Sequence, residues 1–141
     1  MLTFTLFELL GILLATIASI LIGGFWYSPL FAGPTWMREI GLTEEKMKNS
    51  SLTPVQVMVI AILLDVGFAI LLNGLFTWIG VRTIAQGAIF AAACCFVFYV
   101  VPLLVHSVFD DSSKKVWLIY GSHELLHSAV VGAIVSWSIL A

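Results

Sequence analysis

The sequence predicts an all-α polytopic membrane protein, a four-helix transmembrane bundle with an interfacial first loop, and three observations support this. Of the 141 residues, 61% are hydrophobic and 10% are charged, whereas soluble domains carry about 25% charged residues. Four apolar stretches are long enough to cross ~30 Å of hydrocarbon, which takes about 20 helical residues. Tryptophans fall near the ends of these stretches, where the aromatic belts of membrane proteins lie.

The four expected spans are residues 4–27, 54–80, 83–107 and 115–140. No Lys or Arg precedes the first span, so we expect a retained helix rather than a cleaved signal peptide. The second span opens on Thr53-Pro54-Val55-Gln56, which combines an N-cap, a first-turn proline and a capping-box glutamine. Pro102 predicts a kink near the end of the third span. The length suits a single domain of residues 1–141.

Loop charges predict the orientation of the chain in the membrane. The basic residues of the first and third loops are Arg38, Lys46, Lys48, Lys114 and Lys115. Only Arg82 lies in the second loop, on the other side. By the positive-inside rule we expect a multi-pass protein of the inner (plasma) membrane with both termini outside. The first loop, residues 28–51, is apolar and contains two prolines, so we expect it to lie in the headgroup region.

The first loop also carries a family resemblance. Its distinctive residues are Gly24-Phe25-Trp26-Tyr27-Ser28-Pro29-Leu30, then Gly33, Trp36-Met37 and Gly41-Leu42-Thr43-Glu44-Glu45. This series resembles the hallmark of small bacterial membrane proteins catalogued as domain of unknown function 1761, over nearly the whole chain. The resemblance implies four membrane helices and no assigned activity. A Gly-Tyr-His-like triplet opens the last helix in that family, and Gly121-Ser122-His123 is similar to it, whereas Glu124 and His127 lie outside that pattern.

Small residues at helical spacing predict close packing between the spans. The first span has Gly11, Ala15, Ser19 and Gly23 at four-residue intervals. The third is rich in small residues around Gly87 and Ala91, and the fourth has Ser128, Gly132 and Ser136. Such faces let helix backbones approach closely in lipid. We expect a tight bundle, and we expect some of these faces to pair copies of the chain in a homo-oligomer such as a dimer.

Ionisable and amide side chains within the spans predict a polar site, because each charged group costs about 2.5–3.5 kcal/mol in hydrocarbon. The candidate residues are Glu8, Asp65, Asn73, His106, His123, Glu124 and His127. With a rise of about 1.5 Å per residue, Asp65 and His127 fall at the same mid-membrane level. Glu8 and Asn73 fall nearer the outer side and His106 nearer the inner side, so we expect a graded polar path.

Three functions are compatible with these residues. A carboxylate beside histidines can exchange a proton near neutral pH, so the preferred interpretation is binding or transport of a proton, cation or small molecule. His123-Glu124-Leu125-Leu126-His127 also matches the HExxH signature of zinc hydrolases. In that case the two histidines and Asp65 would hold zinc and Glu124 would be catalytic, activating a zinc-bound water. The third function is a non-catalytic membrane partner or lipid-binding subunit that uses the first loop.

Composition excludes other classes. A net charge of −2 provides no basic patch for nucleic acid, so the lipid bilayer is the expected partner. The two cysteines, Cys94 and Cys95, are adjacent in an apolar segment, which is not the pattern of a disulfide framework.

Overall fold

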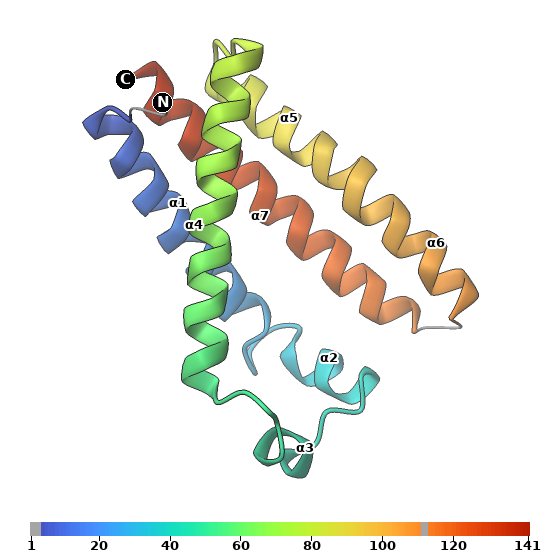
Figure 1. Ribbon diagram of the computed structural model, residues 1–141. Helices are drawn as coiled ribbons and strands as arrows, with labels where there is room; N and C mark the ends of the chain where they lie inside the picture. The colour runs from blue at the N-terminus through green and yellow to red at the C-terminus, as the bar shows by residue number, and fades with distance from the viewer. Residues whose placement is uncertain (1–3, 111–112) are drawn as a thin grey trace.

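The computed structural model describes residues 4–110 and 113–141, and over these residues the chain is helical without strands (Figure 1). Within the described residues, four helical segments are long and apolar enough to cross a membrane, and each begins and ends within a residue or two of its expected limits. The predicted fold class is therefore confirmed. The elements in order are α1 (Leu6–Trp26), α2 (Gly33–Glu39), α3 (Glu44–Lys48), α4 (Pro54–Ile79), α5 (Ile84–Cys95), η1 (Phe96–Val100), α6 (Val101–Phe109) and α7 (Lys114–Leu140).

Local sequence signals determine where the helices begin. Thr53 caps α4 through a capping box with Gln56, as its sequence predicts, and α4 ends at Gly80 in the left-handed conformation with φ 73°. A second capping box begins α1, where the Thr5 hydroxyl accepts from the backbone of Glu8 and the Glu8 carboxylate accepts from the backbone of Thr5. Four otherwise unpaired backbone N–H groups at each helix start make such caps stabilising.

The third span is not a uniform α-helix. Its middle is a π-helical turn, η1, which ends at Val100, two residues before Pro102. Proline lacks an N–H and its ring crowds the carbonyl four residues earlier, so a wider turn just before it relieves that crowding. The irregularity in the structure is thus this π-helical turn, and a kink at Pro102 itself stays a prediction. Phe98 and Tyr99 of the turn line a cavity described below.

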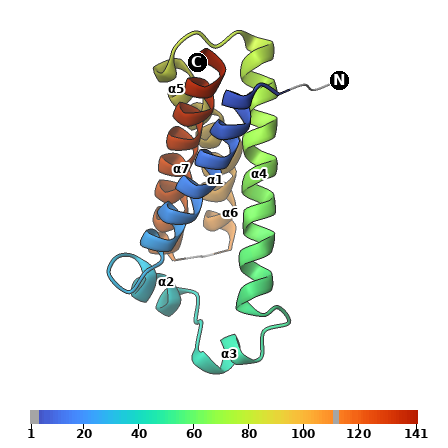
Figure 2. The same ribbon diagram turned by 90° about the vertical axis from the view of Figure 1, so that its left-hand side faces the viewer.

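Helix α7 is the centre of the bundle, with α1 and α5 packed along it (Figures 1 and 2). Glycines allow these contacts, as their spacing predicts. A Cβ atom added to Gly132 would lie 2.7 Å from the carbonyl oxygen of Gly87 and 2.7 Å from the Cβ of Ala91. A Cβ at Gly11 would overlap the side chain of Ser138. The backbones of α5 and α7, and of α1 and α7, are therefore in close contact.

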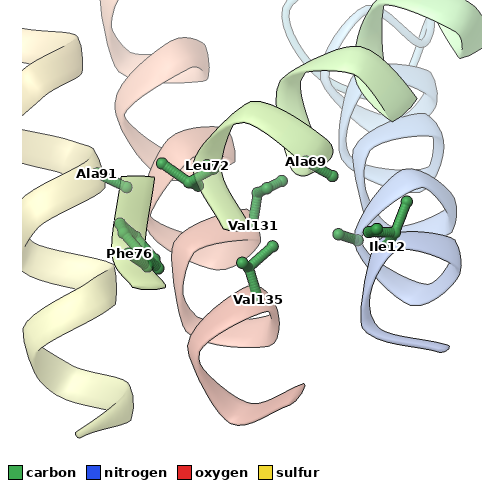
Figure 3. Packing of buried hydrophobic residues seen from close by; sticks show 8 residues of the cluster. Ile12, Ala69, Leu72, Phe76, Ala91, Val131 and Val135 are labelled. Atoms are coloured by element: carbon green, nitrogen blue, oxygen red, sulfur yellow. The ribbon is translucent and has the colours of Figure 1, made fainter. Parts of the chain in front are cut away.

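The apolar core lies in one half of the bundle. Figure 3 shows side chains from α1, α4, α5 and α7 meeting there, with Val131 and Val135 of α7 at the centre. The buried residues of α4 are Ala69, Leu72, Asn73 and Phe76, all in its second half. By contrast, residues 54–61 are exposed throughout. Helix α4 therefore leaves the bundle in its first half, as the ribbon in Figure 1 also shows.

The two ends of the bundle differ in character. Helix α1 begins and α7 ends at the same end, and α2 and α3 lie at the other (Figure 2). Helix α2 is attached to the start of α7 by Glu39, whose carboxylate accepts from the Ser113 hydroxyl at 2.6 Å and pairs with the Lys115 ammonium at 3.2 Å. The α2 part of the first loop is thus folded against the bundle, whereas residues 43–52 are exposed.

Candidate functional site

His127 of α7 is at the centre of the polar site. Its Nε2 atom lies 2.8 Å from the Ser19 hydroxyl of α1 and 3.5 Å from Oδ1 of Asp65 of α4. The Ser19 hydroxyl donates its own proton to the carbonyl of Ala15 at 3.0 Å. When its proton is used in this way, the Ser19 hydroxyl accepts from His127, since a hydroxyl has one proton to donate. This arrangement corresponds to the tautomer of His127 that carries its proton on Nε2, the nitrogen that also faces Asp65.

The other ring nitrogen of His127 faces a second carboxylate. Its Nδ1 atom lies 3.7 Å from Oε2 of Glu124, too far for a direct hydrogen bond, and it is buried without a hydrogen-bond partner among the residues that the structure describes. The other carboxylate oxygen of Glu124, Oε1, lies 3.0 Å from Nδ1 of His123. Carboxylates and imidazoles thus alternate in the order Asp65, His127, Glu124, His123.

The alternation of carboxylates and imidazoles favours binding of a proton between His127 and Glu124. A neutral His127 that carries its proton on Nε2 presents a bare lone pair on Nδ1 to the Glu124 carboxylate. Two acceptors that face each other repel, and a proton on either group turns the repulsion into attraction. The arrangement around His127 therefore has a place for one additional positive charge.

His123 lies among aromatic rings at the loop end of the site. Its ring centroid is 5.7 Å from that of Trp26 and 5.2 Å from that of Tyr27. It stacks on His127 with centroids 5.9 Å apart and ring planes 7° from parallel. The Nε2 atom of His123 is buried without a partner. Like Nδ1 of His127, it is a buried polar atom of the kind that native structures seldom leave unpaired.

The distinctive string of the first loop holds these aromatic rings in place. The Trp26 indole donates to the carbonyl of Ile119 at 3.2 Å, and the Trp36 indole donates to the hydroxyl of Tyr120 at 2.9 Å. A Cβ at Gly33 would overlap the carbonyl of Tyr27, so only glycine fits the tight turn that joins them. The first loop thus closes the site from its own end of the bundle.

Two cavities adjoin the polar site. The larger, about 540 Å³, lies between α4, α7 and the α5–η1 segment. The smaller, about 380 Å³, lies on the opposite side, between α1, α4 and α7. Asp65, Glu124 and His127 line both. The chain of ionisable groups therefore forms the wall between two spaces.

The other candidate residues lie elsewhere, so the expected graded path is interrupted. Glu8 and Asn73 form a separate pair, in which the Asn73 amide donates to Glu8 at 3.3 Å near the end where α1 begins. Asn73 is two helical turns from Asp65, about 12 Å along the axis, and the buried side chains of Ala69 and Leu72 come between. His106 is exposed on α6. An apolar layer thus separates the two polar groups.

The geometry does not favour the zinc interpretation of HExxH. In residues 4–110 and 113–141, no three His, Cys, Asp or Glu side chains are arranged to hold a metal ion. The two imidazole planes are nearly parallel, so their lone pairs do not converge on one point. In addition, Nε2 of His127 is bonded to Ser19, and Nδ1 of His123 faces Glu124.

Several residues at the site were not predicted as functional. Ser19 is recognisable in the sequence only as one of the small residues of a packing face, yet its hydroxyl lies 2.8 Å from Nε2 of His127. Phe68, Phe98 and Tyr99 line the larger cavity, although in the sequence they resemble any other aromatic residue of a membrane span. The proline at position 102 was the one local signal that this part of the third span is irregular.

The fold and the site together define a four-span membrane protein with a cluster of ionisable side chains inside the bundle. The family model described as "Protein of unknown function (DUF1761)" matches residues 10–136, so the chain belongs to this family. The match includes the whole cluster and leaves out Glu8. No curated protein and no solved structure gives a significant match.

Proposed function

We propose that this protein binds a proton or a small cation inside the membrane, at Asp65, His127 and Glu124, and carries it across. The observation on which the proposal rests is the position of His127. Its buried ring lies between two carboxylates, and the nitrogen that faces Glu124 has no hydrogen-bond partner. Ionisable groups at this depth are costly and are retained mainly in pathways for ions, protons and substrates.

The charge balance supports a cation rather than an anion. Asp65 and Glu124 both contact His127, and Glu124 also contacts His123, so with neutral imidazoles the two carboxylates give the cluster a double negative charge. The six Lys and Arg residues of the chain all lie outside the middle of the spans and do not compensate this charge. A proton or a bound cation reduces it, and its binding is thereby favoured.

The arrangement of α4 supports transport over static binding. Asp65 lies where α4 leaves the bundle, between an exposed first half and a packed second half. On the side of the termini, the layer of Ile12, Ala69, Leu72 and Val131 separates the cluster from the Glu8–Asn73 pair. Transport needs the site to open to each side of the membrane in turn. Asp65 lines both cavities, so a tilt of α4 about its packed half would change the α4 wall of both cavities at once.

A second function, as a subunit paired with another membrane helix, is favoured by one observation. Gly67 and Gly74 lie two turns apart on α4, and no atom of the described residues lies within 4 Å of a Cβ added at either. Open glycine faces of this kind let membrane helices associate. We propose a second copy of the chain as the partner. Disulfide cross-linking of a Gly74→Cys variant in membranes tests it, with Ile89→Cys, exposed on helix α5 instead, as the control.

The proposed proton site is tested by infrared spectra of the purified protein at a series of pH values, since protonated carboxyl groups and carboxylates absorb separately. We expect the wild-type spectrum to change near neutral pH. Asp65→Asn and His127→Gln should each alter or abolish that change, because Asn and Gln keep the approximate shape but cannot ionise. Glu44→Gln, at the exposed helix α3, is the control.

Proteoliposomes containing a pH-sensitive dye then test transport. We expect wild-type protein to dissipate an imposed pH gradient faster than Asp65→Asn protein. If both variants match the wild type in spectra and in gradient decay, the cluster is structural and the proposal is wrong.

A further inference from the structure

We propose that the larger cavity binds a lipophilic organic cation, meaning an amine or quaternary ammonium group attached to an apolar body. This inference rests on the proposed function, because it names the class of substrate that the carboxylates Asp65 and Glu124 would hold. Its support comes from the size of the cavity, the charges on its walls and the aromatic rings beside them.

The cavity has the dimensions of a small-molecule site. Its volume of about 540 Å³ falls within the range of roughly 300–1,000 Å³ that ligand pockets occupy. Most of its lining is apolar, including Leu64, Phe68 and Leu72. A ligand that fills it must therefore have a substantial hydrophobic part.

The lining of the cavity includes two acidic side chains. Asp65 and Glu124 both contribute, with 23% and 35% of their side chains exposed. They are joined by His127, which is 8% exposed and has an unpartnered ring nitrogen. The residues that line the cavity include no Lys or Arg. An anionic ligand would meet two carboxylates without a compensating cation, whereas a cationic ligand would pair with them.

Aromatic side chains surround the carboxylates. Phe68 stacks on the ring of His127 with centroids 5.7 Å apart. The π-helical turn η1 adds Phe98 and Tyr99 to the opposite wall. Aromatic faces attract organic ammonium groups, which need no convergent set of ligand atoms. An organic cation thus fits a site whose side chains are not arranged to ligate a metal ion.

The cavity is placed for entry from the lipid. Leu64 and Phe98, on opposite walls, are 68% and 78% exposed on the surface of the spans. A lipophilic cation concentrates in the membrane before it binds, and from there it reaches the carboxylates without crossing the packed core.

The test compares three probes of similar shape: 4-phenylbutyltrimethylammonium, 4-phenylbutanol and 4-phenylbutyrate. Their binding to the full chain is measured by calorimetry in maltoside micelles, which contain no lipid amines to compete. We expect the cation to bind at least about tenfold more tightly than the alcohol, because a buried charge pair adds to the shared apolar contact. The carboxylate should bind more weakly than the alcohol.

Two variants locate the site. Asp65→Asn should weaken binding of the cation by about tenfold or more while the affinity for the alcohol changes less than about twofold. Phe98→Ala should weaken binding of the cation by about three- to tenfold through loss of the aromatic face. Phe98 is largely exposed, so this variant should fold normally. Phe96→Ala, in the same turn but outside the cavity lining, is the matched control.

Equal binding of cation and alcohol, or cation binding that neither variant weakens, would overturn this inference. The infrared pH response is measured without any organic ligand, so the two proposals can fail separately. A normal pH response with no binding of the cation contradicts only the organic-cation site. If the wild-type protein shows neither the infrared pH response nor binding of the organic cation, the proposed function is contradicted as well.

Discussion

The imidazole Nε2 atom of His127 lies 3.5 Å from the Oδ1 atom of Asp65, which joins α7 to α4 at the point where α4 diverges from the bundle. Residues 54–61, which precede Asp65 in α4, are exposed. The buried residues of α4 all follow Asp65 and belong to its second half. A contact between an imidazole and a carboxylate at such a junction depends on the protonation of both groups and on the position of the helix. A change in either one is therefore expected to affect the other.

Metal content should not depend on the HExxH histidines. Since the two ring planes are nearly parallel and Nε2 of His127 is bonded to Ser19, we expect purified protein to contain no stoichiometric zinc. His127→Gln should leave metal content unchanged and alter the pH response. Elemental analysis of wild-type and variant protein measures this. One zinc per chain in the wild type, lost in the variant, would restore the hydrolase interpretation.

Gly132→Ala should destabilise the bundle by about 1–3 kcal/mol, the usual cost of overpacking. The added Cβ would lie 2.7 Å from the carbonyl of Gly87, and backbone atoms cannot move aside cheaply. Gly24→Ala is the matched control, because nothing lies within 4 Å of its added Cβ. Thermal unfolding in detergent, followed by helical circular dichroism, compares the two. Similar unfolding midpoints would show that α5 and α7 are less closely packed than described.

The attachment of α2 to α7 should weaken in acid. The Ser113 hydroxyl and, next, the Lys115 ammonium hold the pKa of the Glu39 carboxyl below its ordinary value. A depressed folded-state pKa means that the contact is fully present above the unfolded-state pKa of about 4.3 and is lost as the pH falls through the folded-state pKa. Spin labels on cysteines introduced at Ile40 and Lys114 should show a narrow distance distribution at neutral pH that broadens below about pH 4.

Glu39→Gln is the control for this measurement, since an amide cannot titrate. Its distance distribution should be broader than that of the wild type at neutral pH and should not change further on acidification. A wild-type distribution that stays narrow in acid would contradict a role for Glu39 in holding α2.

Topology is tested by labelling. Loop charges predict that the first loop is cytoplasmic, so a cysteine introduced at Lys46 should resist a membrane-impermeant reagent in intact cells and react after lysis. A cysteine at Arg82, in the second loop, should react in intact cells. Labelling of the first and not the second position in intact cells would show that the orientation is the reverse.

Much of this architecture could be predicted from the sequence, because its causes are local. Hydrophobicity over about 20 residues determines where a span lies, and Thr53 with Gln56 determines where α4 begins. Small residues at four-residue intervals predicted the close contacts of Gly87 and Gly132. The constant rise of a helix was enough to place Asp65 and His127 at one depth.

Tertiary structure decided the rest, because depth along a helix says nothing about its rotation or its angle to its neighbours. Those depend on contacts such as that between Gly132 and Gly87, made by residues distant in sequence. The rotation of each helix about its own axis places Ser19 of α1 beside His127 of α7 and leaves His106 of α6 exposed. The divergence of α4 opens the larger cavity beside Asp65. Which groups share a proton is therefore decided by how four helices cross, and no single segment of the sequence contains that information.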